Sequence, residues 1–416
     1  MSDHAHAGFA DRIRLVEARA RLRELVVAHD RTERVDLVDA DGRILAEPIA
    51  AGRDVPHYDR AAMDGYAVRA EDTFGAGDRS PAVLRRVDDE SRDDSEGPDD
   101  VELAPGEAVP VHTGSALPPG ADAVVMVEHT ETVGGEVEVF DAVPAGENVA
   151  PVGEDVEDGQ PLFTAGHRLR PSDLGLLKST GIADVRVREP PTVGVIPTGE
   201  ELVQADPGPG EVIETNGMTV AQLVARWGGE PAYRDVVTDD EEALMDAIER
   251  DLDGDVVVTT GGSSVGDRDL LPAVVDAMGE VVFHGVALRP GHPVAAGVVE
   301  GTPVLMLPGY PVSTLVNAFQ LLRPAVKWAG GMPLAELPSN DALLARKVRS
   351  EPGVRTFARV SVEERDGERV ATPTRTSGAG ALSSVALADG WVVVPESREG
   401  IPEGETVAVE DWEWSA

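Results

Sequence analysis

The stretch Asp255-Val-Val-Val-Thr-Thr-Gly-Gly-Ser-Ser-Val-Gly-Asp-Arg-Asp269 decides how this chain is organised. Its residues 256–258 form a β-branched run with no polar break, which is typical of a strand buried on both faces. The Gly-Gly-Ser-Ser at residues 261–264 then supplies a turn, and apolar residues return at helical spacing after it. The stretch therefore predicts a buried strand, a loop and a helix.

The loop combines two kinds of group that suit a phosphorylated ligand. Backbone N–H groups and hydroxyls at the start of a helix suit a phosphate or another oxyanion. Asp267 and Asp269 do not suit a bare anion, but carboxylate oxygens suit a hydrated divalent cation that bridges to phosphate oxygens. The simpler alternative, for this loop taken alone, is a tight turn with solvated aspartates. The candidate phosphate ligands are Gly261, Gly262, Ser263 and Ser264.

Length and composition indicate a soluble multidomain protein. A chain of 416 residues with 42% apolar residues can form two to four domains with well-buried cores. It has no apolar run of membrane-spanning length, and the N-terminus lacks the layout of a signal peptide, so we expect a cytoplasmic protein. The absence of cysteine excludes disulfides, thiolate metal sites and a cysteine nucleophile.

The chain is strongly acidic. The formal net charge is −40, from 76 acidic and 36 basic residues. Such an excess opposes binding to nucleic acid or to an anionic membrane, so we expect neither partner. Because the acidic residues are mostly dispersed along the chain, they predict a solvated, halophile-type surface rather than an acidic tail for a basic partner.

The residue patterns predict an α/β plus β fold. Residues 9–30 are expected to form a helix with Ile13, Val16 and Ala20 on its packed face. Strands and helices alternate in the middle of the chain, which predicts a mostly parallel sheet covered on both faces. The expected domains are a helical and β linking domain (1–52 and 148–185), a small β domain (53–147), an α/β domain (186–331) and a C-terminal β domain (332–416).

Three strands of the α/β domain are predicted to end in polar Gly or Pro loops. Besides the central loop, these are Thr198-Gly-Glu-Glu201 and Pro308-Gly-Tyr-Pro311. Ligands of parallel sheets bind beyond the carboxyl ends of the strands, so the three loops predict a binding site at one edge. In the small β domain, Asp64-Gly65 precedes an apolar alternation, for which a hairpin is the simple interpretation.

Taken together, the motifs resemble those of the MoeA family, the molybdopterin molybdenumtransferases, whose animal relative is the E domain of gephyrin. The resemblance covers nearly the whole chain, and the order and spacing of the motifs make it specific. The motifs that carry it are Asp59-Arg-Ala-Ala-Met-Asp-Gly-Tyr-Ala67, Thr113-Gly114, Thr198-Gly-Glu-Glu-Leu202, Glu214-Thr-Asn216, Gly261-Gly-Ser-Ser-Val-Gly-Asp-Arg-Asp269 and Leu307-Pro-Gly-Tyr-Pro-Val-Ser313.

The resemblance implies an elongated four-domain subunit in a homodimer, with the cleft between the sheet domain of one copy and the small β domain of the other. It implies insertion of molybdate into adenylated molybdopterin with loss of AMP, assisted by Mg²⁺ or another divalent metal. A molybdopterin adenylyltransferase is a further partner that it implies.

The resemblance also implies roles for individual residues. The catalytic set is Asp64, Thr113, Glu201, Asp239 and Asp269, of which Asp239 and Asp269 are expected to bind the metal. The simpler alternative for Asp239 is a helix cap, because Thr238-Asp-Asp-Glu241 is also a capping box. The expected cofactor-binding residues are Thr198, Gly199, Asn216, Gly261, Gly262, Ser263, Ser264, Pro308, Gly309, Arg289, His292 and Ser313.

The chain departs from the family pattern at two places. The basic turn is Arg289-Pro-Gly-His292-Pro where Lys-Pro-Gly-Lys-Pro is usual, and Tyr310 stands where Asn is common. We expect Arg289, His292 and the Ser313 hydroxyl to form an oxyanion pocket, because arginine offers an anion a planar fork of donors. The alternative is a β-turn whose arginine pairs with a surface glutamate.

The sequence leaves three alternative functions open. Molybdate and tungstate have nearly the same size and charge, so a tungsten-specific paralogue is one of them. A molybdopterin adenylyltransferase-like enzyme is another, although those enzymes lack the Met63-Asp-Gly-Tyr66 segment and the C-terminal β domain. A non-catalytic scaffold is the third, and it would need no converging carboxylates.

Overall fold

The computed structural model describes residues 12–87, 102–261, 270–374 and 380–414. The chain forms two compact units. The first comprises residues 1–33, 42–46 and 186–416, and the second comprises residues 34–41 and 47–185. In the described ranges, no helix combines the length and the hydropathy needed to cross a bilayer.

The second unit contains a six-stranded sheet with the order β7-β4-β6-β5-β9-β8. Small β-branched and alanine side chains fill its core, among them Val68, Val125 and Val137. The strands are β4 (Gly65–Val68), β5 (Ala82–Arg86), β6 (Glu107–Val111), β7 (Ala123–Met126), β8 (Thr130–Val133) and β9 (Glu136–Val139). Short 3₁₀ turns are η2 (Ala70–Thr73) and η4 (Val127–His129).

The hairpin interpretation of Asp64-Gly65 is wrong. β4 pairs with β6 and β7, which are distant in sequence, whereas β3 (Arg60–Ala61) pairs with β10 (Val149–Ala150). Glycine is required at position 65 because a Cβ there would lie 1.9 Å from the carbonyl oxygen of Val125. The glycine therefore serves close backbone approach rather than a turn.

Within the described residues, the remainder of the second unit contains one α-helix, α2 (Pro171–Ser179). Asp173 closes its first turn: the carboxylate accepts the backbone N–H of Arg170 at 3.0 Å and lies 2.8 Å from Nε2 of His167. These contacts, led by the Arg170 side chain, lower the pKa of Asp173 to about 2. The other elements are η1 (Leu37–Asp39) and β2 (Ile49–Ala50), which pairs with β11 (Pro161–Phe163). β1 (Thr32–Asp36) pairs with β12 (Asp184–Arg188), and each of these two strands has residues in both units.

The first unit is built on a six-stranded sheet with the order β16-β13-β17-β21-β20-β18. The first four strands are parallel, and β20 and β18 are antiparallel to their neighbours. Neither β16 nor β20 was predicted as a strand. The strands are β13 (Thr192–Pro197), β16 (Glu230–Tyr233), β17 (Val256–Thr260), β18 (Glu280–His284), β20 (Ala295–Val299) and β21 (Thr302–Leu307).

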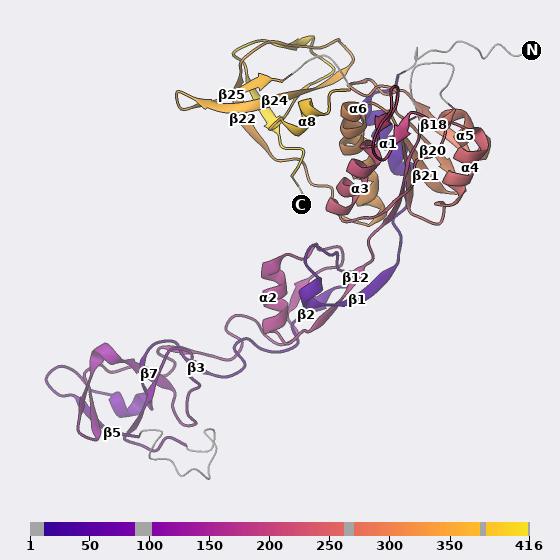
Figure 1. The fold of residues 1–416 in the computed structure, drawn as a ribbon. Coiled ribbons are helices and arrows are strands. Elements are labelled where there is room, and N and C mark those ends of the chain that lie inside the picture. Colours follow the sequence, from indigo (N-terminus) through magenta and orange to yellow (C-terminus); the bar gives the residue numbers. More distant parts are fainter. Residues whose placement is uncertain (1–11, 88–101, 262–269, 375–379, 415–416) are drawn as a thin grey trace, which may run out of the picture. The chain divides into compact units, whose positions relative to one another are not determined.

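Helices cover both faces of this sheet, as the alternation of strands and helices predicted (Figure 1). Val195, Val258 and Leu305 pack on one face against α1, α3 and the α6-to-α7 segment, while Val257 and Met306 pack on the other against α4 and α5. This alternation follows from the two-residue period of a strand. The helices are α1 (Leu15–Leu25), α3 (Asn216–Arg226), α4 (Glu241–Glu249), α5 (Leu271–Met278), α6 (Pro311–Asn317), the π-helical η5 (Ala318–Leu322) and α7 (Arg323–Ala329).

Helix α1 differs from its prediction in length and in orientation. It is shorter than the predicted 9–30, and its buried residues are Leu15, Ala18 and Leu22. Val16, which was expected on the packed face, is 71% exposed. The spacing of the three buried residues follows the helical period, so the helix is rotated relative to the expected face.

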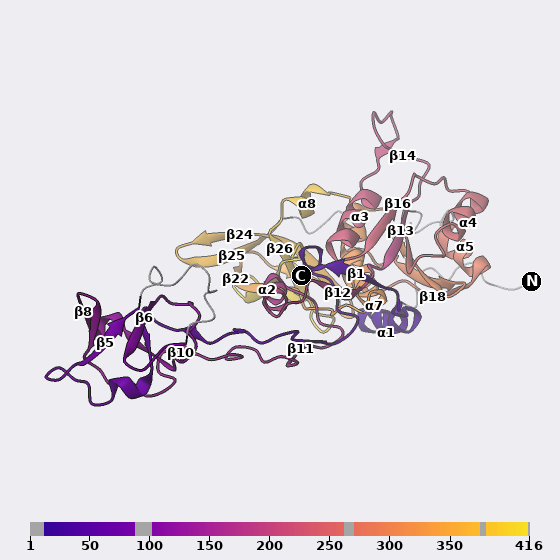
Figure 2. The same ribbon diagram turned by 90° about the horizontal axis from the view of Figure 1, so that it is seen from below.

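A small pair of strands, β14 (Leu202–Val203) and β15 (Val212–Ile213), projects from the sheet of the first unit (Figure 2). Val212 and Ile213 are 55% and 44% exposed. The pair directly precedes α3, so it links the end of β13 to the start of that helix.

The C-terminal part of the first unit forms a curled sheet. β24 pairs with both β25 and β26, which closes the order β24-β25-β22-β28-β26 on itself. The predicted C-terminal β domain is therefore barrel-like. Its elements are β19 (Leu288–Arg289), β22 (Ser339–Leu344), β23 (Val348–Arg349), β24 (Arg355–Arg365), β25 (Glu368–Pro373), α8 (Ser383–Ala386), β26 (Gly390–Val394), β27 (Gly400–Ile401) and β28 (Thr406–Glu410).

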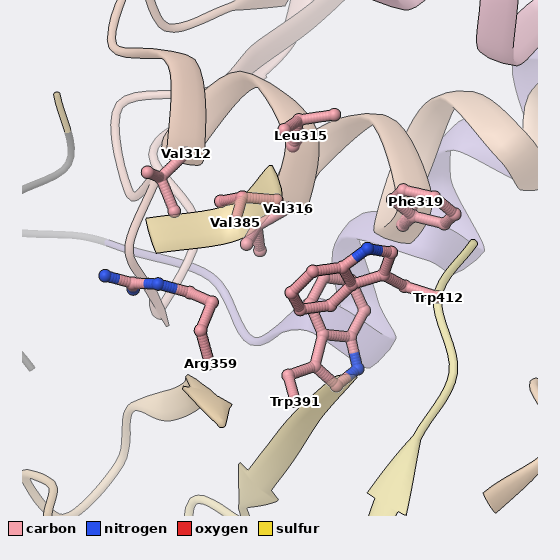
Figure 3. A pocket seen from close by; sticks show the side chains of 8 residues that line it. All are labelled: Val312, Leu315, Val316, Phe319, Arg359, Val385, Trp391 and Trp412. Atoms are coloured by element: carbon pink, nitrogen blue, oxygen red, sulfur yellow. The ribbon is translucent and has the colours of Figure 1, made fainter. Parts of the chain in front are cut away.

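Aromatic side chains join this barrel to the helices of the α/β sheet. Trp391 on β26 lies edge-on to Phe319 of η5, with ring centroids 5.6 Å apart, and 4.7 Å from Trp412. A small apolar cavity remains beside these three rings, with Val312 and Val316 of α6 on its other side (Figure 3). Apart from Arg359, the lining side chains are aliphatic or aromatic, so we regard the cavity as a packing gap between the barrel and the helices.

Candidate functional site

The loops after β13, β17 and β21 meet at the carboxyl edge of the parallel strands, as predicted. Gly261 has a φ of +127°, and a Cβ there would lie 2.0 Å from the carbonyl oxygen of Thr198. A Cβ on Gly309 would lie 3.4 Å from Cα of Gly261. Gly261 is therefore required where the loops after β13 and β17 meet, and Gly309 brings the third loop within ordinary contact distance of it. Pro308, directly before Gly309, is buried.

Two buried hydroxyls lie at the same edge. The Thr198 and Thr260 side chains are each 1% exposed, and their Oγ1 atoms have no hydrogen-bond partner among the described residues. Gly262, Ser263, Ser264, Asp267 and Asp269 follow directly in the chain and lie outside the described residues. Their predicted roles therefore remain predictions.

Asn216, at the start of α3, connects that helix to the loop after β21. Its Nδ2 donates a hydrogen bond to the carbonyl oxygen of Gly309 at 2.7 Å. Glu214 supports this arrangement: it is 4% exposed and accepts the backbone N–H of Gly217 at 2.6 Å and the hydroxyl of Tyr233. The Glu214 role was missed, although an acidic residue directly before a helix is a signal for it.

Glu201 and Asp239 form an acidic pair beside Gly199. The Glu201 carboxylate lies against this glycine, with Oε2 2.9 Å from where a Cβ of Gly199 would be. Burial, and then the charges of Glu201 and Glu200, raise the pKa of Asp239. A cation would relieve this repulsion, so the two carboxylates fit a divalent metal chemically.

The helix-cap alternative for Asp239 is wrong. The N-cap of α4 is Asp240, whose side chain accepts the backbone N–H of Ala243 at 3.0 Å. Asp239 is therefore not used as the cap. Within the part of the chain that the structure describes, no three His, Cys, Asp or Glu side chains are grouped so that they could hold a metal. Because Asp269 is outside that part, the metal site stays a prediction.

In the second unit, Asp64 and Thr113 lie in direct contact. Oδ1 of Asp64 accepts the backbone N–H of Thr113 at 2.6 Å and its hydroxyl at 2.9 Å. These bonds, the backbone bond first, lower the pKa of Asp64. The carboxylate is therefore ionised at neutral pH and held in one orientation on the exposed surface of the small β sheet.

The basic turn is held against α6, but its arginine has a carboxylate partner. Arg289 Nη1 lies 2.9 Å from Glu351 Oε1, and both side chains are more than half exposed. This is the ion pair of the alternative interpretation. Asn317, which the sequence did not single out, donates from Nδ2 to the carbonyl oxygens of Gly291 and Ser313, each at 2.9 Å.

The surroundings of His292 favour its neutral form. Burial lowers its pKa, and the positive charges of Arg12 and Arg289 lower it further. Ser313 is 3% exposed, in the first turn of α6. An anion at this turn would thus meet one charged and one neutral side chain, and the oxyanion pocket remains a prediction.

Comparison with known proteins identifies the family along nearly the whole chain. Residues 13–181 match the MoeA N-terminal region (domain I and II), residues 194–328 match a probable molybdopterin binding domain, and residues 341–412 match the MoeA C-terminal region (domain IV). A putative molybdopterin biosynthesis protein of Methanocaldococcus jannaschii is 36% identical, with 94% of each chain covered. The molybdopterin molybdenumtransferase of Bacillus subtilis is 32% identical, with 92% of each covered.

Solved structures agree with these matches. A molybdopterin biosynthesis MoeA protein from Pyrococcus horikoshii superposes with a TM-score of 0.82 at 36% identity, covering 97% of this chain and 100% of that one. A second such structure, from strain OT3, has a TM-score of 0.80 at 32% identity and covers 96% and 99%. The sequence matches and the shared fold together show that this chain belongs to the MoeA family.

Proposed function

We propose that this protein is a molybdopterin molybdenumtransferase, which inserts molybdate into adenylated molybdopterin and releases AMP. The observation that carries the proposal is the meeting of three loops at the carboxyl edge of the sheet, with the Glu201–Asp239 carboxylate pair beside them. Such an edge is where open parallel sheets bind ligands. Curated relatives that match over more than nine-tenths of their length carry this enzyme name.

Asp239 and Asp269 are the residues that would hold a divalent metal in this proposal. A bound Mg²⁺ would supply positive charge to the phosphate as AMP leaves. Burial and the neighbouring carboxylates raise the pKa of Asp239, so a cation bound nearby would stabilise its ionised form. Asn216 keeps the Gly309 loop in place, and the buried Thr198 hydroxyl lies within the same loop cluster.

Asp64 and Thr113 are proposed to act on the substrate from a second copy of the chain, in a homodimer. An ionised carboxylate held by Thr113 suits the N–H donors of a pterin ring. Sedimentation at high salt tests the dimer, since a fully active monomer would refute it. We further propose a cytoplasmic location, a halophilic setting and a molybdopterin adenylyltransferase as the supplier of the substrate.

The decisive test is incubation of the purified protein with adenylated molybdopterin, Mg²⁺ and either molybdate or tungstate, with AMP release and metal insertion measured together. Asp239→Asn should lose most turnover, because the neutral amide lacks the negative charge that attracts a divalent cation. Asp240→Asn is the matched control: it changes the adjacent carboxylate, and asparagine is an equally good helix cap. If both variants turn over as the wild type does, the metal assignment is wrong.

The same assay separates the proposed activity from its alternatives. Insertion of tungstate but not molybdate would identify a tungsten-specific paralogue. In a parallel incubation with molybdopterin and ATP, adenylation would identify an adenylyltransferase-like enzyme. No turnover with either oxyanion would favour a scaffold. Metal-dependent AMP release with insertion of molybdate is the expected result.

A further inference from the structure

Tyr310 presents an aromatic ring to solvent at the proposed binding edge. It follows Gly309 in the loop after β21, and its side chain is 63% exposed. Aromatic residues make up only 4% of the chain, and most of the large rings of the first unit are buried in its core. A strongly exposed tyrosine on a ligand-facing loop is therefore an unusual feature of this molecule.

The backbone that carries the ring is held by several hydrogen bonds. The carbonyl oxygen of Tyr310 accepts the N–H of Thr314 at 2.9 Å and its hydroxyl at 3.1 Å. Asn216 holds the preceding carbonyl, that of Gly309, at 2.7 Å. Prolines on both sides of Gly309-Tyr310 restrict the loop further. Little backbone freedom would be lost when a ligand packs on the ring.

Two glycines lie close to the loop that carries the ring. A Cβ on Gly380 would lie 3.6 Å and 3.9 Å from two ring carbons of Tyr310, so a segment without a side chain lies beside one edge. On the other side of the loop, Gly309 packs against Gly261. The ring thus lies next to the meeting point of the glycine loops rather than on a remote surface.

We propose that Tyr310 is a stacking platform for a planar heteroaromatic ring of the substrate. This inference rests on the proposed function, which supplies two such rings, the pterin and the adenine. Every planar heterocycle has a π-face, so one tyrosine can accept either ring. Stacking is also uncharged, which suits recognition of an anionic substrate by a chain with a net charge of −40.

The test measures binding of AMP and of free pterin to the full-length protein at high salt, by calorimetry and by quenching of the pterin fluorescence. Tyr310→Ala should weaken binding of the stacked ring by about 5- to 150-fold, the range that aromatic stacking gives. Tyr310→Phe should bind within about threefold of the wild type, because it keeps the ring. Phe74→Ala is the matched control, since Phe74 is 69% exposed and is not among the residues proposed to contact the substrate.

Each outcome decides the proposal. Weaker binding of AMP alone assigns the platform to adenine, and weaker binding of pterin alone assigns it to the pterin. The proposal is overturned if Tyr310→Ala binds both rings as the wild type does, if Tyr310→Phe loses as much as Tyr310→Ala, or if the wild type binds neither ring. In turnover assays Tyr310→Ala should raise KM and leave kcat unchanged. Ring binding without metal insertion would refute the proposed function and leave the platform intact.

Discussion

Trp391 should contribute strongly to the coupling between the C-terminal barrel and the α/β sheet. The side chain is 2% exposed, its ring lies 5.1 Å from Phe357, 5.6 Å from Phe319 and 4.7 Å from Trp412, and Nε1 donates to Glu410 at 2.7 Å. Burying about 150–250 Å² at about 25 cal/mol per Å² is worth about 4–6 kcal/mol. Measured Trp→Ala losses in protein cores are about 3–5 kcal/mol, so we expect Trp391→Ala to lose about 4 kcal/mol.

Urea unfolding at high salt, followed by circular dichroism and by fluorescence, measures this loss. About 4 kcal/mol is a large part of the stability of an ordinary domain, so Trp391→Ala should show an early transition of the barrel. Trp391→Phe should lose about half as much, because it keeps a ring between the same neighbours. Trp328→Ala is the control: this half-buried ring stacks with Arg23 at 5.4 Å, outside the aromatic cluster. If Trp391→Ala loses no more than Trp328→Ala, the reasoning is wrong.

Three further predictions concern carboxylates. The folded state raises the pKa of Asp239, so the ionised side chain destabilises the metal-free protein at pH values above its ordinary pKa of 3.8. Without Mg²⁺, Asp239→Asn should therefore have a higher Tm than the wild type, and it should lose the rise in Tm that Mg²⁺ causes. A lower Tm for the variant without Mg²⁺ would contradict this. Thr113→Val removes the side-chain hydrogen bond that helps to lower the pKa of Asp64. The acid limb of the pH–rate profile should therefore move to higher pH, and turnover should fall roughly fivefold. Thr113→Ser keeps the hydroxyl and is the control that should be unaffected. The pKa of Asp173 falls from 3.8 to about 2 on folding, which corresponds to about 2.4 kcal/mol, and solvent screening of the 68% exposed Arg170 reduces this to about 1 kcal/mol. Asp173→Asn should therefore be less stable by about 1 kcal/mol above pH 4, and the difference should vanish as the pH falls toward 2. A difference that does not change with pH would contradict the third prediction.

The sequence by itself determined the parallel core of the sheet domain and the edge at which its three polar loops meet. An unbroken run of β-branched residues has to be buried on both faces, and alternating strands and helices require parallel connections. Parallel strands place their carboxyl ends together, so the convergence of the Thr198, Gly261 and Gly309 loops followed from order along the chain. The candidate residues followed from the family motifs.

Only the tertiary structure decided which partner each of these groups has. Hydrogen-bond partners can be far apart in sequence: Asn216 and Gly309 are separated by 93 residues, and Arg289 and Glu351 by 62. Side-chain periodicity reports which face is buried, but it carries no information about contacts at that range. Local sequence could not tell Asp240 from Asp239 as the cap of α4 either, because both carboxylates precede the helix and only that of Asp240 reaches the backbone N–H of Ala243.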